Sequence, residues 1–231
     1  MKKLIRFISA LLLPAIVSMA LASCSDDNSE LIEAAKKYYS DKLAAFSAEN
    51  GDYSPFEVDA VFLGDSLTDG YDLKKYFPEY LVLNRGISGD TTVGLQARLK
   101  VSVYDVQPKA VVMLIGANNM DVMMENYEDI LLGFKENLPK SRIILLSLTS
   151  MSGEWGKKNQ LAAYNNVQIK MLAEKHGFDF VDLYSALLNL ETGEIYAEYT
   201  TDGGHLTSRG YEVLTSKIKP ALKGALASFG N

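Results

Sequence analysis

The chain alternates between short apolar runs and longer segments in which apolar residues recur every three or four positions. The apolar runs end at glycine, proline or polar residues, as buried β-strands do. They cover residues 58–63, 80–84, 110–115, 143–148 and 178–182. Segments with helical spacing lie at about 91–103, 121–138, 160–176 and 207–229. Strands that alternate with helices predict a parallel sheet with right-handed crossovers.

This alternation predicts an α/β fold, with one doubly wound α/β/α domain around a central parallel sheet of five strands. The sequence contains no internal repeat, low-complexity segment or interior linker. Residues 149–158 are expected to form a loop after the fourth strand, and 190–201 a small turn or hairpin. Pro220 is expected to bend the last helix.

The N-terminus has the pattern of a signal peptide. Basic residues at positions 2, 3 and 6 precede an apolar run over 8–21, which is too short for a stable membrane span. The run ends in Leu21-Ala22-Ser23-Cys24, which resembles the lipobox of bacterial lipoproteins. This resemblance implies a signal peptide over 1–23, a lipid on Cys24 and a lipid-anchored protein of the bacterial cell envelope, periplasmic or at the cell surface.

The segment after the signal peptide is polar and acidic over 24–30 and is expected to be a tether. Apolar residues at helical spacing between Leu31 and Phe46 then predict an amphipathic helix over about 29–49. The domain is expected to span 31–231, with the helix 31–49 packed on its outside.

Composition and charge narrow the classes of function. The 231 residues are 48% hydrophobic and 23% charged, which suits one globular domain with a sizeable core. The net charge is −6, and loss of the signal peptide makes the chain more acidic, which argues against nucleic acid as a partner. Cys24 is the single cysteine, so no intrachain disulfide forms. With two histidines and no clustered cysteines, we expect no metal site and no cofactor.

Four polar stretches stand just after a predicted strand or just before the last helix. They are Gly64-Asp65-Ser66, the segment 84–92, Gly116-Ala117-Asn118-Asn119 and Asp202-Gly203-Gly204-His205. Because the carboxyl ends of parallel strands lie on one edge of a sheet, these stretches can converge.

The residue types in these stretches are those that acyl transfer requires. Ser66 can attack a carbonyl, and His205 can take its proton and return it to the leaving group. Asp202 can accept the second imidazole N–H and fix the tautomer. The backbone N–H groups of Ser66 and Gly89 and the side-chain amide of Asn118 can form an oxyanion hole, in which one donor is worth about 10²–10³ in rate.

Each of these residues also has a structural interpretation when it is taken alone. Asp202 can be a turn former, and His205 a neighbour of a helix cap. Gly89 can be a turn glycine, and Asn118 can satisfy the backbone of a turn. His176, at the end of a predicted helix, is interpreted as structural.

Taken together, the four stretches resemble the SGNH, or GDSL, hydrolase family. Gly64-Asp65-Ser66-Leu67 resembles its first block, with Ser66 as nucleophile, and Gly89 matches the glycine of the second. Gly116-x-Asn118 matches the third block and Asp202-x-x-His205 the last. The resemblance covers about residue 58 to the C-terminus. It is strongest to the branch that contains the platelet-activating-factor acetylhydrolase catalytic subunits.

This resemblance implies a flavodoxin-like fold, no metal, and ester hydrolysis through an acyl-enzyme. Many members have Asn-Asp in the third block, whereas this chain has Asn118-Asn119, so no role is carried over from that aspartate. The chain has no Gly-x-Ser-x-Gly, so the nucleophile elbow of α/β-hydrolases is not supported. The order serine, aspartate, histidine nevertheless agrees with that fold.

The expected function is that of a serine esterase that hydrolyses short acyl esters, chiefly acetyl esters. The alcohol part of the ester can be a carbohydrate, because an enzyme anchored to the cell envelope meets glycans first. Trp155 can stack on a sugar or pack on the domain, and Met123 and Met124 can line an acyl pocket or belong to the core. One alternative is a lysophospholipase or thioesterase for longer acyl chains. Another is a non-catalytic surface lipoprotein that binds a glycan or a partner. The sequence predicts no particular oligomeric state.

Overall fold

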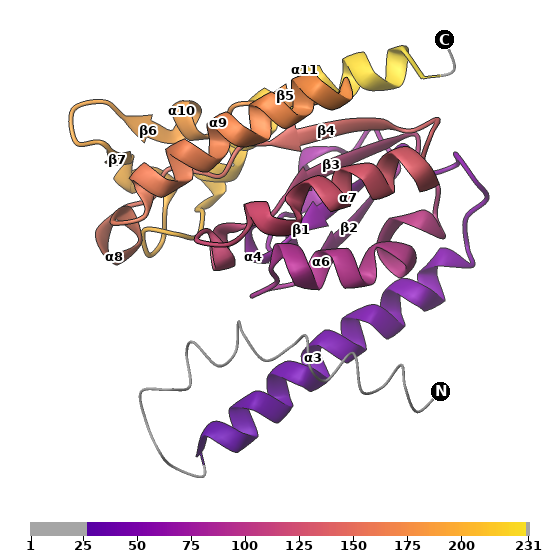
Figure 1. The fold of residues 1–231 in the computed structure, drawn as a ribbon, viewed down its shortest axis with the longest axis horizontal. Coiled ribbons are helices and arrows are strands. Elements are labelled where there is room, and N and C mark those ends of the chain that lie inside the picture. Colours follow the sequence, from indigo (N-terminus) through magenta and orange to yellow (C-terminus); the bar gives the residue numbers. More distant parts are fainter. Residues whose placement is uncertain (1–26, 230–231) are drawn as a thin grey trace.

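Five parallel strands form the central sheet, in the order β2-β1-β3-β4-β5 (Figure 1). The strands are β1 (Ala60–Gly64), β2 (Val82–Gly86), β3 (Ala110–Leu114), β4 (Arg142–Leu146) and β5 (Asp179–Val181). This structure is a computed structural model, and it describes residues 27–229. The α/β fold with a parallel five-stranded sheet, predicted from the sequence, is confirmed.

The order of the strands creates a switch point between β1 and β3. The chain runs from β1 to the edge strand β2 and then returns past β1 to β3. In open α/β sheets the crevice for ligands lies outside the carboxyl ends of the strands at such a point. Gly64, Gly86 and Leu114 are in register there, so the stretches after β1, β2 and β3 begin side by side.

Alternate strand residues pack into two cores, one on each face of the sheet. Val61 and Leu63 face one core, and Ala60 and Phe62 face the other. Because both faces are covered, β1, β3 and β4 are apolar almost throughout, whereas the edge strand β2 carries Asn84 and Arg85.

Helices cover both faces, as their buried residues show. The first face is covered by α6 (Thr92–Leu99), α7 (Met124–Asn137) and α9 (Asn159–His176). The second is covered by α11 (Ser208–Ala227) and by the short helices α4 (Ser66–Asp69), α5 (Leu73–Tyr76) and α10 (Tyr184–Leu187).

Smaller elements complete the chain. They are a π-helix η1 (Lys100–Tyr104), 3₁₀ helices η2 (Ala117–Asn119) and η3 (Ala197–Tyr199), helix α8 (Gly153–Gly156), and the antiparallel pair β6 (Leu188–Asn189) and β7 (Glu194–Ile195). The pair β6–β7 forms a small hairpin over 188–195, which begins before the range 190–201 expected for a turn or hairpin, and η3 occupies part of the rest of that range. The loop 149–158 contains α8.

The observed boundaries differ from the predicted ones by a few residues. Val58 is fully buried but precedes β1, because an apolar run reports burial and not the extent of the hydrogen-bonded ladder. The helix predicted over 91–103 changes from α to π geometry after Leu99. Helix α11 continues through Pro220 to Ala227.

Helix α3 (Asp27–Asn50) lies outside the two covering layers, beside α6 and η1 (Figure 1). It begins at Asp27, so it includes the last residues of the tether expected over 24–30. Its C-terminal half is attached to the domain: Phe46 is buried, and Asn50 Nδ2 donates to the carbonyl of Val101 at 2.7 Å. The predicted signal peptide and Cys24 lie outside the described residues. Within residues 27–229, no helix combines the length and apolarity that a membrane span needs.

The junction between β1 and α4 requires glycine at position 64. A Cβ on Gly64 would lie 2.2 Å from Thr68 Oγ1 and 2.3 Å from the carbonyl oxygen of Leu114. Helix α4 can therefore fold back against the sheet directly after β1. Asp65 caps this helix, since its Oδ1 accepts the N–H of Leu67 at 3.1 Å.

The Asp65 side chain is buried, and its Oδ2 has no hydrogen-bond partner within the described residues. Burial raises its pKa from 3.8 to about 7, a shift that the Leu67 N–H opposes and nearby Asp90 reinforces. A carboxyl group whose pKa is higher in the folded state than in the unfolded state contributes stability below its unfolded pKa. That contribution is lost as the pH rises through the folded pKa.

We predict that Asp65→Asn changes how stability depends on pH. Asparagine keeps the capping oxygen but cannot ionise, so the variant lacks the loss of stability that Asp65 causes between about pH 4 and pH 7. At about 1.4 kcal/mol per pKa unit, this loss is at most about 4 kcal/mol. Urea unfolding of both proteins at pH 4 and pH 8 measures the difference.

The matched control is Asp182→Asn. Asp182 is exposed and also accepts a backbone N–H, that of Ser185 at 3.0 Å. The prediction is wrong if Asp65→Asn and Asp182→Asn alter the pH dependence of the unfolding free energy equally.

Candidate active site

The four polar stretches meet at the carboxyl edge of the sheet. Ser66 is the first residue of α4, directly after β1 and Asp65. Its Oγ lies 3.1 Å from Nε2 of His205, which precedes α11. The structure therefore places the serine and the histidine within hydrogen-bond distance, although they are far apart in the sequence.

The turn from Asp202 to His205 explains the spacing of these two residues. Asp202 Oδ1 accepts the backbone N–H groups of Gly204 at 2.9 Å and His205 at 2.7 Å. Asp202 Oδ2 is thereby left to contact Nδ1 of His205 at 2.7 Å. One carboxylate both builds the turn and orients the imidazole ring, so Nε2 points toward Ser66.

The same contacts set the charge of Asp202. The backbone N–H of His205, its side chain and the N–H of Gly204 lower the pKa of Asp202 to about 2. The carboxylate is therefore ionised at neutral pH, with the side chains of Asp202 and His205 48% and 49% exposed. Both side chains are therefore accessible from solvent.

The segment 86–90 begins at the last residue of β2 and is here called the oxyanion loop, after the role that the sequence predicts for Gly89. Gly89 has φ +79°, which favours glycine, and a Cβ there would meet nothing within 4 Å. The requirement for glycine is therefore conformational and not steric. Within the described chain the Gly89 N–H has no hydrogen-bond partner, so it is available to a ligand.

Asn118, in η2 after β3, lies beside the oxyanion loop. Its Nδ2 donates to the backbone carbonyl of Asp90 at 2.8 Å, and the amide retains a second N–H. The neighbouring Asn119 donates to Thr92 Oγ1 at 2.9 Å and accepts the Thr92 N–H at 3.3 Å. An aspartate at 119 would lack the donor for the first of these bonds.

Of three further residues singled out in the sequence, Met123 and His176 have structural places, and Trp155 lies beside the Asp202–His205 turn. Met123 is fully buried in the first core, so it does not line a pocket. His176 contacts Glu128 Oε1 at 2.8 Å and stacks on Phe178, as a structural residue would. Trp155 is half-buried in α8, with its ring 3.2 Å from where a Cβ of Gly204 would lie.

Arg98 is a buried residue at the site that sequence analysis missed. It donates from Nε to Asp90 Oδ2 at 2.7 Å, and both side chains are almost completely buried. It also donates to the carbonyls of Arg85 at 2.9 Å and Gly64 at 3.0 Å. The spacing of Asp90 and Arg98 is the only sequence signal for this pair, and it does not distinguish a buried ion pair from an exposed one.

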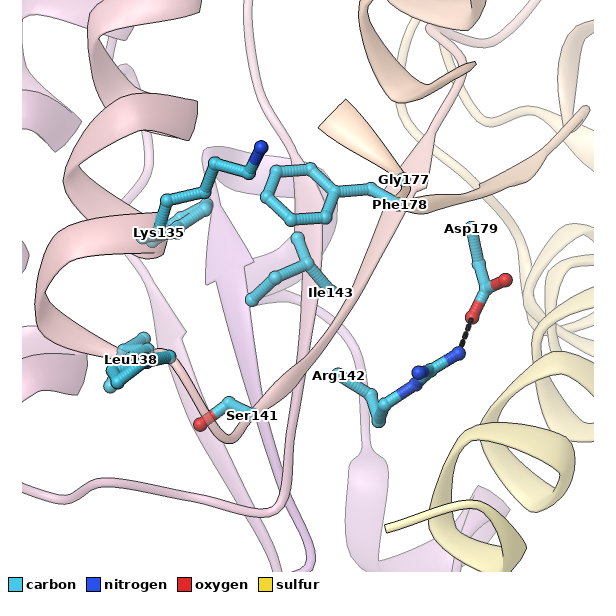
Figure 2. A pocket seen from close by; sticks show the side chains of 10 residues that line it. Lys135, Leu138, Ser141, Arg142, Ile143, Gly177, Phe178 and Asp179 are labelled. Atoms are coloured by element: carbon cyan, nitrogen blue, oxygen red, sulfur yellow. Dashed lines mark ion pairs between the residues drawn. The ribbon is translucent and has the colours of Figure 1, made fainter. Parts of the chain in front are cut away.

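The opposite edge of the sheet carries two pockets, of about 290 and 330 Å³. Figure 2 shows the first, with Phe178, Ile143 and the Arg142–Asp179 ion pair in its wall. None of its lining residues is histidine, and the hydroxyl of Ser141 donates to Pro108. The first pocket thus has room for a ligand but no grouping of a nucleophile with a base. The candidate site is therefore the hydrogen-bonded series of Ser66, His205 and Asp202 at the carboxyl edge of the sheet.

The candidate site has the groups that nucleophilic acyl transfer needs: a hydroxyl, an imidazole, a carboxylate and donors that can meet an oxyanion. Among residues 27–229, no three His, Cys, Asp or Glu side chains are grouped so as to hold a metal ion.

Comparisons with known proteins show which proteins this chain is similar to. A human protein named isoamyl acetate-hydrolyzing esterase 1 homolog is 25% identical over 242 residues, which cover 91% of this chain and 90% of the relative. A structure from Streptococcus pneumonia, provisionally named a platelet activating factor, is 26% identical with a TM-score of 0.76, covering 86% of this chain and 100% of that one. An acetylxylan esterase from Geobacillus stearothermophilus shares the fold, at 21% identity and a TM-score of 0.61, covering 73% of this chain and 95% of that one.

The sequence profile of the GDSL-like lipase/acylhydrolase family matches residues 62–213, which is more than half of the chain. This range includes each of the four stretches that meet at the carboxyl edge of the sheet. The chain therefore belongs to the GDSL-like lipase/acylhydrolase family, and it is an ester hydrolase.

Proposed function

We propose that the protein is a serine esterase that hydrolyses short acyl esters, chiefly acetyl esters, through Ser66, His205 and Asp202. One observation carries the proposal: Ser66 Oγ, the His205 ring and Asp202 Oδ2 form a continuous chain, with separations of 3.1 and 2.7 Å. Hydrogen bonds of this kind are what a serine needs to become a nucleophile at neutral pH.

The proposed reaction begins with attack of Ser66 Oγ on the ester carbonyl, while His205 Nε2 takes the hydroxyl proton. The tetrahedral oxyanion is bound by the N–H groups of Ser66 and Gly89 and by the Asn118 amide. The Ser66 N–H suits this role because the first N–H of a helix has no acceptor within the helix. His205 then protonates the leaving alcohol, and an acyl-enzyme remains on Ser66.

Water completes the cycle. His205 removes a proton from a water molecule, which attacks the acyl carbonyl, and the carboxylic acid leaves as Ser66 recovers its proton. The ionised Asp202 stabilises the imidazolium in both halves of the reaction.

Two observations support a short acyl group. Gly89, Asn118 and His205 are exposed and Ser66 is half-buried, so a long acyl chain would bury little apolar surface against them. The human relative carries the name of an enzyme that hydrolyses an acetyl ester. The acylated alcohol is proposed to be a carbohydrate, with Trp155 beside the Asp202–His205 turn as a ring on which a sugar can stack. Attachment to the cell envelope through a lipid on Cys24 remains part of the proposal.

We predict that a fluorophosphonate probe labels the wild-type protein covalently and does not label Ser66→Ala. The variant should also lose more than about 1,000-fold in kcat on an aryl acetate, because no other hydroxyl replaces the nucleophile. Ser216→Ala, at an exposed position of α11, serves as the control and should retain both properties. Labelling that persists in Ser66→Ala would contradict the assignment of the nucleophile, and no labelling of the wild type would favour a binding protein.

We predict that Asp202→Asn lowers kcat by about 10³–10⁴-fold with little change in the free energy of unfolding. Asparagine can still accept the N–H groups that build the turn, but it does not hold Nδ1–H of His205 as a carboxylate does. Because its pKa is about 2, Asp202 remains ionised above about pH 4, so its protonation does not shape the activity profile from pH 4 to 9. Steady-state kinetics and urea unfolding measure the two effects. A change in kcat of only a few-fold would mean that another group orients His205.

We predict that kcat/KM on a series of aryl esters does not rise from acetyl toward octanoyl. In a buried acyl pocket, each methylene would add about 0.8 kcal/mol, or about fourfold in kcat/KM. The measurement is a comparison of acetyl, butyryl and octanoyl esters of one phenol. A rise with chain length would favour a lysophospholipase or thioesterase.

A further inference from the structure

Helix α3 lies outside the part of the chain that matches the family profile, yet two of its side chains reach the edge of the site. Tyr38 and Lys42 are one helical turn apart, and both bind the carboxylate of Asp69, the last residue of α4. Lys42 donates to Oδ1, and the Tyr38 hydroxyl donates to Oδ2. The Asp69 side chain is 18% exposed, so water competes little for these contacts.

Ser88 of the oxyanion loop joins the same cluster through both its main chain and its side chain. Its Oγ donates to Asp69 Oδ2 at 2.7 Å, and its N–H donates to the Tyr38 hydroxyl at 3.2 Å. Ser88 directly precedes Gly89. The hydroxyl of Tyr38 is therefore in contact with the peptide next to the one that bears the proposed oxyanion donor.

The cluster is held together by charge. Burial acts to raise the pKa of Asp69, but hydrogen bonds from Lys42, Tyr38 and Ser88 outweigh it and lower the pKa. Asp69 is thus ionised at neutral pH, and hydrogen bonds to an ionised acceptor are about twice as strong as neutral ones.

The oxyanion loop needs such support on its outer side. From within, Ile87 N–H donates to the carbonyl of Gly64 at 3.1 Å, and Asp90 is paired with Arg98. Above Gly89 the space is open. A donor stabilises an oxyanion only within a few tenths of an ångström of its best position, and a shift of about 1 Å can cost about 100-fold in rate.

We propose that Tyr38 is a positioning residue, which acts through Asp69 and Ser88 to hold the Gly89 N–H where the oxyanion forms. Helix α3 then contributes to catalysis by positioning an oxyanion donor, in addition to packing on the outside of the domain. The inference rests on the proposed function, since it requires Gly89 to be an oxyanion donor.

The test removes one hydroxyl at a time from α3. Tyr38→Phe should lower kcat about tenfold and change KM less than about twofold, because the oxyanion exists only in the transition state. The matched control is Tyr39→Phe, one position further along the helix. Tyr39 donates to the carbonyl of Gly94 at 3.3 Å, in α6 and outside the oxyanion loop. This control should keep kcat within about twofold of the wild type.

Two further measurements separate positioning from a general loss of stability. The rate of Ser66 phosphonylation by a fluorophosphonate should fall with kcat in Tyr38→Phe, since the phosphoryl oxygen uses the same donors. Combining Tyr38→Phe with Ser88→Ala should cost less than the product of the two single losses, because both act through one cluster. Thermal unfolding midpoints should be similar for the two tyrosine variants.

Equal kcat values for Tyr38→Phe and Tyr39→Phe would overturn the inference, as would multiplicative losses in the double variant. A fall in kcat that tracks the unfolding midpoint in both tyrosine variants would also overturn it. These results leave the proposed function intact as long as Ser66→Ala is inactive and unlabelled. An active Ser66→Ala would overturn the proposed function itself.

Discussion

The buried guanidinium of Arg98 holds together the strand ends on which the site is built. It bonds to the carbonyls that end β1 and lie near the end of β2, to the carboxylate of Asp90, and to Ser102 Oγ at 2.9 Å. Burying an ion pair is weak evidence for stability, because desolvation offsets much of the attraction. The contribution of this ion pair here is to hold the strand ends in position. Gly64 and Arg85 precede Ser66 and the oxyanion loop, so the Arg98 side chain fixes the distance between Ser66 and the loop.

The oxyanion loop is thus held from two sides by two charges of opposite sign. On the buried side of the loop, Arg98 forms an ion pair with Asp90. On the side facing α3, Asp69 accepts a hydrogen bond from Ser88. Donors that are fixed before the substrate arrives need no reorganisation during the reaction. Electrostatic stabilisation of this kind is usually the largest single contribution to catalysis. An exposed site can therefore be preorganised, because the contacts that Arg98 and Asp69 make with the loop supply the rigidity that a closed pocket would otherwise provide.

The order of strands and helices could be predicted from the sequence because apolar runs and helical spacing are local patterns. The convergence of the stretches after β1, β2 and β3 followed from the topology, since parallel strands end on one edge. Asp202 and His205 directly follow no strand of this sheet, so their place beside Ser66 rested on the family resemblance. The roles of Arg98 and Asp69 could not be predicted. Each lies on a helix where a charged residue normally indicates the solvent face, and each has partners in elements distant in the chain. These two side chains meet their partners only because the folded chain brings distant elements together.

Two carboxylates near His205 have opposite environments, and this contrast shifts their pKa values in opposite directions. Burial raises the pKa of Asp65 to about 7, whereas hydrogen bonds from the turn around His205 lower that of Asp202 to about 2. Asp65 is directed at the start of α4 and caps it, and Asp202 contacts the ring. Pairs of acids whose pKa values are driven apart by their surroundings take different roles. Of the two carboxylates, Asp202 is the one that contacts the His205 ring and stays ionised across the neutral range, so it is the one placed to balance a proton on the imidazole.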